Sequence, residues 1–467
     1  MPEFHAEPYI YLPAVSHKSA LIAWGAFYFR TNSRGKWKIV DDDDLKYVHP
    51  PRKDSIGAQS APYGPARVEI YDASGKTVSS ATTEVANHCW VSGLQAGTEY
   101  TYKVFVKGQE WASGERWDWD AKERALVQSG GVYDNRFQTN PDATRPADSL
   151  AFAVIGDFGV GVKRDSPKRR QQQVAHALKR TVDSEGVRFL LTTGDNIYAR
   201  LRVLGVVIGD SGDEDDDWFF TYFQPYRYVL NRIPVYPSIG NHDADETEER
   251  DDRAQVEDNF YLCERIRSEE AAGRASFGPG LFYRFRYGSE IEFVCIDTSK
   301  EDFFRGYRLF EFPKHWEFME QSFPAEGPHP AWRIPFAHHP LYSAGPQHHN
   351  TRGMEKLLPL FERSGVSVMF TGHEHNFQHS RTPAMDHFVT GAAGKVRRRP
   401  PDDFTAAHTV SWATDCHFLL ARIEGRRMTV RAIGAIDDPD AVPADIERFA
   451  PDGQPVGGPI EIELRTD

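Results

Sequence analysis

The sequence has no run of 18 or more apolar residues, so it does not predict a membrane-spanning helix. Its N-terminus, MPEFHAEPYIYLPAVSH, lacks the basic segment followed by an apolar segment that is typical of a signal peptide. As written, the chain is expected in the cytoplasm, and secretion stays open if a precursor segment is missing. Basic residues are also in deficit, because 55 Lys and Arg stand against 68 Asp and Glu, giving a net charge of -13. This balance argues against general binding to nucleic acid, which depends on Lys and Arg that neutralise phosphates.

Cysteine is scarce as well. The four cysteines lie far apart and form no CxxC pair; they are Cys89, Cys263, Cys295 and Cys416. We therefore expect reduced and mostly buried thiols. With 40% hydrophobic and 26% charged residues, the chain has the composition of a folded protein, and 467 residues favour two domains. Nothing in the sequence indicates an oligomeric state.

Residues 1–140 are predicted to form an all-β sandwich. Short strand-like runs alternate with turn-forming residues, as in SALIAWGAFYF, ARVEIY and TEYTYKVFV. The stretch from Leu94 to Tyr102 resembles the tyrosine-corner segment of fibronectin type III domains, in which a Tyr near a strand start hydrogen-bonds back to the preceding turn. The polar, Pro-containing residues 141–149 are then predicted to be a linker.

From residue 150 to residue 467 the pattern changes to apolar strand runs that alternate with helical segments. This pattern predicts a layered α/β domain, a β-sandwich flanked by helices. The strand-like runs are LAFAVIG, VRFLLTTG, IPVYPSIG, IEFVCIDT, WRIPFAHH and VSVMFTG; the helix-like runs include QQQVAHALKRTV and MEKLLPLFERSG. The run HFLLARIEGRRMTVRAIG is predicted to form two strands around a Glu-Gly turn.

Polar motifs stand where these apolar strands end. Ligands bind at the carboxyl ends of strands in open α/β sheets, and a Gly before the polar residue is expected to let the chain turn sharply there. The set offers two carboxylates, an amide oxygen, three imidazoles and a phenol, which suit Fe, Zn or Mn rather than Cu(I). The motifs are Gly156–Gly159 (GDFG), Gly194–Tyr198 (GDNIY), Gly240–Asp243 (GNHD), His338–Pro340 (HHP) and Gly372–Asn376 (GHEHN).

In order and spacing, these motifs resemble the DxG, GDxxY, GNH, lone His and GHxH pattern of the purple acid phosphatases, a family of the calcineurin-like metallophosphoesterase superfamily. The resemblance runs from Phe152 to about Arg422, and the upstream sandwich is similar to that of plant-type members. Most of the wider superfamily has a His at the position of Gly159. The resemblance implies that Tyr198 replaces this ligand, and a phenolate implies Fe(III) because it is a hard, anionic donor.

The resemblance also implies a role for each site residue. Four residues would hold Fe(III), and four would hold a divalent Zn, Mn or Fe ion, with one carboxylate shared. The iron ligands would be Asp157, Asp195, Tyr198 and His375; the ligands of the divalent ion would be Asp195, Asn241, His338 and His373. His242 would be the general acid that protonates the leaving group. Either His348 or His349 would contact the substrate, and the sequence does not distinguish between them.

These residues predict a metal-dependent phosphate-ester hydrolase. The favoured activity is that of an acid phosphatase on small phosphomonoesters, with an Fe(III)–M(II) centre that activates hydroxide for in-line attack on phosphorus. Phosphodiesters or the pyrophosphate of nucleotides remain alternative substrates for the same site. A nuclease is disfavoured by the acidic balance and by Tyr198. The more distant alternative is a non-catalytic binding module, which an N-terminal sandwich would suit.

Overall fold

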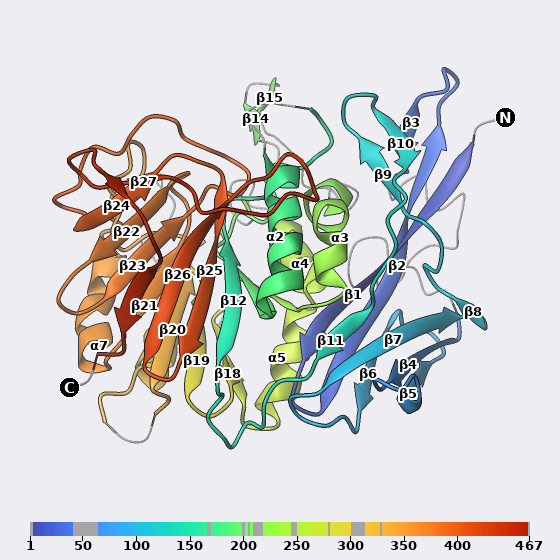
Figure 1. The fold of residues 1–467 in the computed structure, drawn as a ribbon, viewed down its shortest axis with the longest axis horizontal. Helices are drawn as coiled ribbons and strands as arrows, with labels where there is room; N and C mark the ends of the chain where they lie inside the picture. The colour runs from blue at the N-terminus through green and yellow to red at the C-terminus, as the bar shows by residue number, and fades with distance from the viewer. Residues whose placement is uncertain are drawn as a thin grey trace.

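The computed structural model describes residues 3–40, 64–165, 170–198, 201–203, 206–208, 218–243, 250–278, 281–299, 313–326 and 329–465. Strands dominate, in an N-terminal β-sandwich and a larger layered domain (Figure 1). Within the described residues, no helix combines the length and the apolar character needed to cross a membrane. All four cysteines lie in the described part, and none of them forms a disulfide.

The N-terminal region folds as two antiparallel sheets. The first contains β1 (Phe4–Val15), β2 (Ser19–Thr31), β3 (Trp37–Ile39) and β6 (His88–Ser92). The second contains β4 (Ala66–Tyr71), β5 (Thr77–Thr83), β7 (Glu99–Val106), β8 (Gln109–Glu110) and β11 (Arg136–Gln138). A separate hairpin joins β9 (Trp117–Asp120) to β10 (Ala125–Gln128).

The sandwich fits a fibronectin III-like domain. Along β7, buried and more exposed side chains alternate, as expected for a strand with one face in the core. The Tyr100 hydroxyl accepts a 3.0 Å hydrogen bond from the backbone N–H of Gln95, so the predicted tyrosine corner is confirmed. Residues 141–149, the predicted linker, contain no helix or strand.

Strands β1 and β2 are buried on both faces. One face packs inside the sandwich, and the other joins the core of the layered domain. Aromatic side chains make this second contact: the ring centroids of Tyr9 and Phe223 are 4.6 Å apart, and those of Phe27 and Phe219 are 5.1 Å apart. β1 and β2 therefore contribute one face to the core of the sandwich and the other to the core of the layered domain, which explains why the run in β2 is apolar rather than alternating.

The layered domain contains two mixed sheets. The six-stranded sheet has the order β16 (Val235–Pro237), β13 (Val187–Thr192), β12 (Leu150–Ile155), β25 (His417–Glu424), β26 (Arg427–Gly434) and β29 (Ile460–Glu463). The ten-stranded sheet has the order β17 (Ala275–Phe277), β18 (Tyr283–Tyr287), β19 (Ile291–Ile296), β20 (Trp332–Ala337), β21 (Val368–Thr371), β23 (Asp386–Thr390), β22 (Phe377–Arg381), β24 (Thr409–Ala413), β27 (Arg448–Phe449) and β28 (Pro455–Val456). A short hairpin is formed by β14 (Leu201–Val203) and β15 (Val206–Ile208).

The two sheets pack face to face through aromatic rings. Phe152 in β12 lies 5.1 Å from Phe293 in β19 and 5.9 Å from Phe370 in β21, measured between ring centroids. Between the six-stranded sheet and the N-terminal strands lie α2 and α3 (Figure 1). The helices are α2 (Gln171–Glu185), the π-helix η1 (Phe219–Phe223), α3 (Gln224–Leu230), α4 (Arg250–Asn259), α5 (Leu262–Glu270), α6 (Pro313–Ser322), the 3-10 helix η2 (Met354–Leu357) and α7 (Leu358–Arg363).

The predicted strand runs of this domain all contain strands, and QQQVAHALKRTV lies in α2. The run HFLLARIEGRRMTVRAIG forms the β25–β26 hairpin. The run MEKLLPLFERSG differs from expectation, because it divides into η2 and α7. Pro359 stands in the first turn of α7, where its missing N–H costs nothing, and it could not continue an α-helix from the preceding turn.

Candidate metal centre

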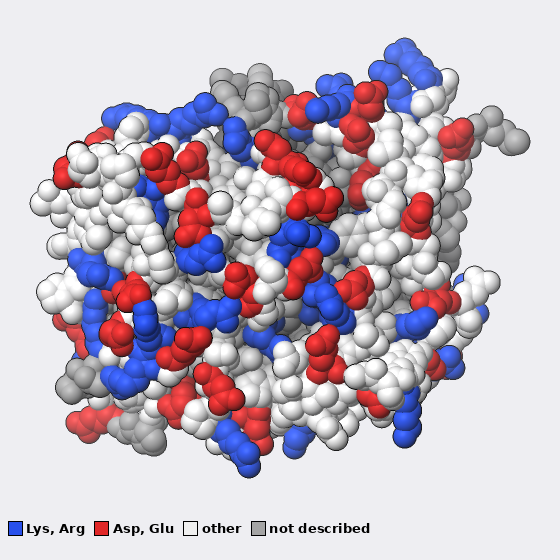
Figure 2. Space-filling view, in the orientation of Figure 1, with Lys and Arg blue, Asp and Glu red and all other residues white. Residues whose placement is uncertain are grey.

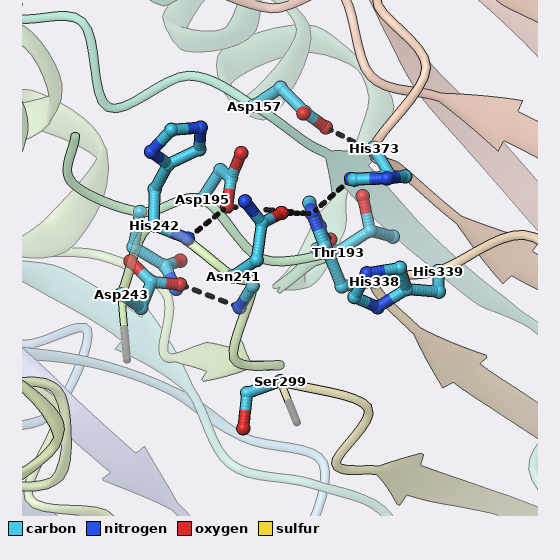
Figure 3. A network of polar contacts seen from close by, with 12 residues as sticks. Asp157, Thr193, Asp195, Asn241, His242, Asp243, Ser299, His338, His339 and His373 are labelled. Atoms are coloured by element: carbon cyan, nitrogen blue, oxygen red, sulfur yellow. Dashed lines mark hydrogen bonds and ion pairs between the residues drawn. The ribbon is translucent and has the colours of Figure 1, made fainter. Parts of the chain in front are cut away.

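The predicted site residues come from five loops that follow strands β12, β13, β16, β20 and β21. Parallel pairing of β12 with β13, of β13 with β16 and of β20 with β21 brings the carboxyl ends of neighbouring strands to the same edge. The polar ends of Asp157, Asp195, Asn241, His338 and His373 accordingly point toward one another (Figure 3). All seven side chains predicted as metal ligands lie at this edge.

One part of the cluster surrounds Asp157. Its Oδ1 lies 3.3 Å from Nε2 of His375 and 3.4 Å from the hydroxyl of Tyr198. The Tyr198 hydroxyl is 3.5 Å from the same nitrogen of His375. Ligand atoms of Asp157, Asp195 and His375 all fall within 4.8 Å of one another. This grouping could hold one metal ion, since ligand atoms about 2.1 Å from an ion are about 3 Å from each other.

A second part of the cluster surrounds His338. Its Nε2 is 3.0 Å from Oδ1 of Asn241, 3.4 Å from Oδ1 of Asp195 and 3.1 Å from Nδ1 of His373. The other ring nitrogen, Nδ1, donates a 2.8 Å hydrogen bond to the carbonyl oxygen of Thr193. This bond fixes the ring so that the lone pair of Nε2 faces the cluster, as in metal-binding histidines.

Backbone conformation at the strand ends differs from the expected glycine-led turns. Asp157, Asp195 and His373 themselves have positive φ angles, of 54°, 52° and 70°. Such angles are uncommon for residues with a side chain, and they cluster at functional sites. Of the four glycines that precede ligands, Gly194 also has a positive φ, of 86°.

The glycines instead allow close approach of neighbouring loops. A Cβ at Gly156 or at Gly240 would lie 2.1 Å from a side-chain oxygen of the adjacent loop. At Gly159, a Cβ would lie 2.3 Å from the backbone of Asn196. This position therefore has no room for the histidine that most of the superfamily carries there.

Burial makes the carboxylates of the site costly to ionise by themselves. It raises the pKa of Asp157 to about 8, although the charges of His338 and Lys395 act in the opposite direction. Burial also opposes ionisation of Asp195, but His338 and His242 outweigh it and hold the pKa of that carboxyl well below its usual range. For Tyr198, burial and the two carboxylates raise the pKa of the phenol well above its usual value. A cation among these groups would favour their charged forms, so the donor set fits a metal centre.

His242 and Asp243 follow the ligand candidate Asn241. The backbone N–H of His242 donates a 3.1 Å hydrogen bond to Asp195, and its ring centroid is 4.5 Å from that of Tyr198. The buried carboxylate of Asp243 accepts hydrogen bonds from the N–H groups of Gly240 and Ile197, at 2.8 and 3.0 Å. Asp243 therefore ties two ligand loops together.

Comparison with known proteins agrees with this geometry. The family profile described as "Calcineurin-like phosphoesterase" matches residues 150–377. The chain carries a calcineurin-like phosphoesterase domain. Purple acid phosphatase 4 of Arabidopsis thaliana is 25% identical over 308 residues, covering 62% of this chain and 81% of that protein. Human tartrate-resistant acid phosphatase type 5 is 25% identical over 323 residues, covering 63% and 89%.

Solved structures show that the two-part architecture is shared. The structure of PhoD covers 98% of this chain with a TM-score of 0.61 at 12% identity, and this chain covers 94% of it. Purple acid phosphatase PPD1 from yellow lupin seeds covers 95% of this chain with a TM-score of 0.60 at 14% identity, with 74% of PPD1 covered. Together with the domain match, the phosphatase homologues make this protein a hydrolase that acts on phosphoric ester bonds. They also imply a binuclear metal centre.

In the phosphoesterase domain, one of the two candidate substrate histidines faces the cluster. The ring centroid of His348 lies 3.9 Å from that of His373 and 6.5 Å from that of His375. His349 is exposed. The loop that carries His348 turns tightly at Gly345, because a Cβ at this glycine would lie 2.1 Å from the carbonyl oxygen of His348.

Sequence reasoning missed the contacts that hold the His348 loop. Glu374 stands between the two histidines of the GHEHN motif and is fully buried. Its carboxylate accepts a 2.9 Å hydrogen bond from the N–H of His348 and a 2.6 Å hydrogen bond from Nε of Arg397. A charged residue between two ligand candidates at the end of a buried strand was the available signal for this role.

Two further side chains of the phosphoesterase domain lie beside the cluster. His339, which the sequence places next to a ligand candidate, is buried and bonds through Nδ1 to the hydroxyl of Thr298 at 3.0 Å. The ammonium of Lys395 lies 3.6 Å from the ring centroid of Tyr198. No motif pointed to Lys395, because its approach depends on how the loop after β23 folds back.

Proposed function

We propose that the protein is a phosphomonoesterase of the acid phosphatase type, with Fe(III) and a divalent Zn, Mn or Fe ion side by side. The convergence of ligand atoms in two overlapping groups carries this proposal, because Asp195 is close to both. Its neighbours on one side would be Asp157, Tyr198 and His375; on the other side they would be Asn241, His338 and His373. The distances of 3.0 to 3.5 Å between neighbouring donor atoms suit two ions that share a carboxylate.

Tyr198 supports the assignment of iron to the first group. Its side chain is almost fully buried, and the absence of room at Gly159 leaves the phenol as the donor on that side. Burial and two adjacent carboxylates oppose ionisation of the phenol, so a phenolate here needs a strongly charged ion nearby. A trivalent ion meets this need better than a divalent one.

Beside the metal ions, two histidines of the chain would act on the substrate. Bound metal ions would neutralise charge on the phosphoryl oxygens and supply a water-derived nucleophile. His242 would give a proton to the leaving oxygen, because its ring stands beside Tyr198 at the edge of the cluster. His348, rather than His349, would contact the phosphoryl oxygens, since it faces His373.

The test combines metal analysis, visible absorption and turnover on purified protein. We expect about two metal ions per chain, including iron, and a visible band that disappears in Tyr198→Phe. Tyr222→Phe is a matched control, because Tyr222 is equally buried but packs against Phe260, outside the cluster. We expect p-nitrophenyl phosphate to be hydrolysed faster than bis(p-nitrophenyl) phosphate.

Each alternative gives a different result. A diester turned over at least as fast as the monoester would replace the phosphomonoesterase by a phosphodiesterase. A colourless protein that holds two Zn or Mn ions and hydrolyses phosphate esters would rule out iron in the centre but leave the phosphoesterase. Bound metal without turnover of any phosphate ester would favour a non-catalytic binding module.

A further inference from the structure

The segment 393–397, called the strap below, runs along two of the five loops that carry ligand candidates, those of Asp157 and His375. Its backbone N–H groups donate hydrogen bonds to carbonyl oxygens in those loops. Ala393 bonds to Gly156 at 3.1 Å, Lys395 bonds to Asp157 at 3.2 Å, and Arg397 bonds to His375 at 2.8 Å. Alternate residues of the strap are thus fixed relative to the metal centre.

The strap brings two cations to the cluster, with different surroundings. Arg397 is engaged by the buried carboxylate of Glu374, which offsets its charge. Lys395 extends over the aromatic ring of Tyr198, at 3.6 Å from the centroid, and its charge acts on the carboxylates of Asp157 and Asp195. Because the backbone N–H groups of Lys395 and Arg397 bond to the carbonyl oxygens of Asp157 and His375, both cations stand beside ligand candidates of the centre.

The overall electrostatic field of the protein does not attract anions. The net charge is -13, and Figure 2 shows acidic and basic side chains interspersed over the face in view. Attraction of a phosphate ester therefore depends on local positive charge at the centre itself. Lys395 supplies such a charge on a flexible stem whose ammonium has three N–H donors.

We propose that Lys395 contacts the phosphoryl oxygens of the substrate and makes the site selective for phosphate monoesters over diesters. This inference rests on the proposed function and adds the residue that sets its substrate class. A monoester carries close to two negative charges at pH 7, whereas a diester carries one. Because Coulomb attraction scales with the charge of the ligand, one ammonium stabilises the bound monoester more than the bound diester.

The experiment compares two substrates in the metal-loaded enzyme and three variants. In Lys395→Met we expect kcat/KM to fall about tenfold or more for p-nitrophenyl phosphate and about threefold or less for bis(p-nitrophenyl) phosphate. Lys395→Arg, which keeps the positive charge, should keep most of the wild-type preference for the monoester over the diester. Arg398→Gln removes the same charge from an exposed neighbour of the strap, and we expect both rates to stay within about twofold.

Binding of inorganic phosphate, followed by calorimetry, gives a readout that does not depend on turnover. We expect its Kd to rise about tenfold in Lys395→Met and to stay near the wild-type value in Arg398→Gln. Metal content and the Tyr198-dependent band, if present, verify that the centre is intact. If Lys395→Met does not load metal, Lys395→Gln takes its place, and the Lys395→Arg comparison applies in either case.

Equal losses on the two substrates, or unchanged phosphate binding, would overturn the proposal and leave Lys395 as a packing partner of Tyr198. A changed visible band with an unchanged substrate ratio would overturn it as well. Failure of the proposed function looks different, because the wild-type protein would then hydrolyse neither substrate or would prefer the diester.

Discussion

The fully buried carboxylate of Glu374 accepts a 2.6 Å hydrogen bond from Nε of Arg397, which crosses from the strap to the GHEHN loop. The second oxygen of Glu374 accepts the N–H of His348. One side chain thus connects the strap, the loop between two ligand candidates and the loop that carries the candidate substrate histidine. Neither the strap nor the histidine loop contains a helix or a ladder of strands to stabilise it independently.

Replacing Glu374 tests this connection. Glu374→Ala removes the partner of the partly buried Arg397 and leaves the His348 N–H without its acceptor, so we expect a loss of about 2 kcal/mol in unfolding free energy. Glu374→Gln retains an acceptor and should lose less. Denaturant unfolding measures the stability, and KM for p-nitrophenyl phosphate reports the position of His348. Equal stability of wild type and Glu374→Ala would show that the connection is not structural.

The adjacent pair His348 and His349 allows a matched comparison. His348 lies against His373, whereas His349 is exposed. We expect His348→Ala to lower kcat/KM by about one to two orders of magnitude, because a positioned polar contact to the reacting group is lost. His349→Ala should stay within about twofold of wild type. Steady-state kinetics on metal-loaded protein give kcat/KM for both variants. A larger loss in His349→Ala than in His348→Ala would assign the substrate contact to His349.

A buried ion-pair network joins the N-terminal sandwich to the phosphoesterase domain. Glu7 of β1 lies 2.9 Å from Arg227 of α3 and 3.4 Å from Arg116, and the three side chains are at most 4% exposed. Glu7→Ala would leave two buried guanidinium groups without this carboxylate, so we expect a loss of about 3 kcal/mol or more.

The control for Glu7→Ala is Glu110→Ala in the same sandwich, where an exposed pair with Lys103 at 2.9 Å should contribute about 1 kcal/mol or less. Because β1 and β2 cover part of the core of the layered domain, we also expect a chain that starts at Asp148 to be insoluble or inactive. A soluble, fully active fragment of that kind would show that the sandwich is dispensable.

Buried neutral histidines predict an acid limit to stability. The Nε2 of His387 accepts the N–H of Leu341 at 3.3 Å, and burial lowers the pKa of His387 to about 3. Burial also lowers the pKa of His417 to about 4. Between these values and the unfolded value of about 6.5, the unfolded chain binds protons that the folded chain does not. Stability is therefore retained above about pH 6.5 and declines as the pH falls through this window.

The measurement is the unfolding free energy at pH 7.5, 6.0 and 5.0 for wild type and His387→Gln. One such group adds up to about 1.4 kcal/mol per pH unit to the slope. We expect His387→Gln to be less stable at pH 7.5 but to lose less unfolding free energy on acidification. Its amide oxygen can accept the hydrogen bond from the N–H of Leu341 and does not titrate. Parallel curves would show that His387 does not contribute.

The sequence by itself determined which strands lead into the site and the order in which the ligand motifs follow them. The strand-like run TEYTYKVFV predicted β7, and Tyr100 marked the tyrosine corner. Apolar runs predicted eight strands of the two larger sheets, including the five that lead into the site. Because parallel strands end at one edge, polar residues after those strands had to meet, and all seven ligand candidates do. These features follow from local periodicity and from chain direction, which the sequence contains.

Only the tertiary structure decided how the loops meet. It placed His348 rather than His349 against the cluster, buried Glu374 between Arg397 and the His348 loop, and laid Lys395 over Tyr198. It also showed that Gly156 and Gly240 are needed for close approach, while Asp157 and Asp195 take the positive φ angles. The physical reason is that a loop side chain takes its direction from contacts with segments remote in sequence, and no local pattern records those contacts.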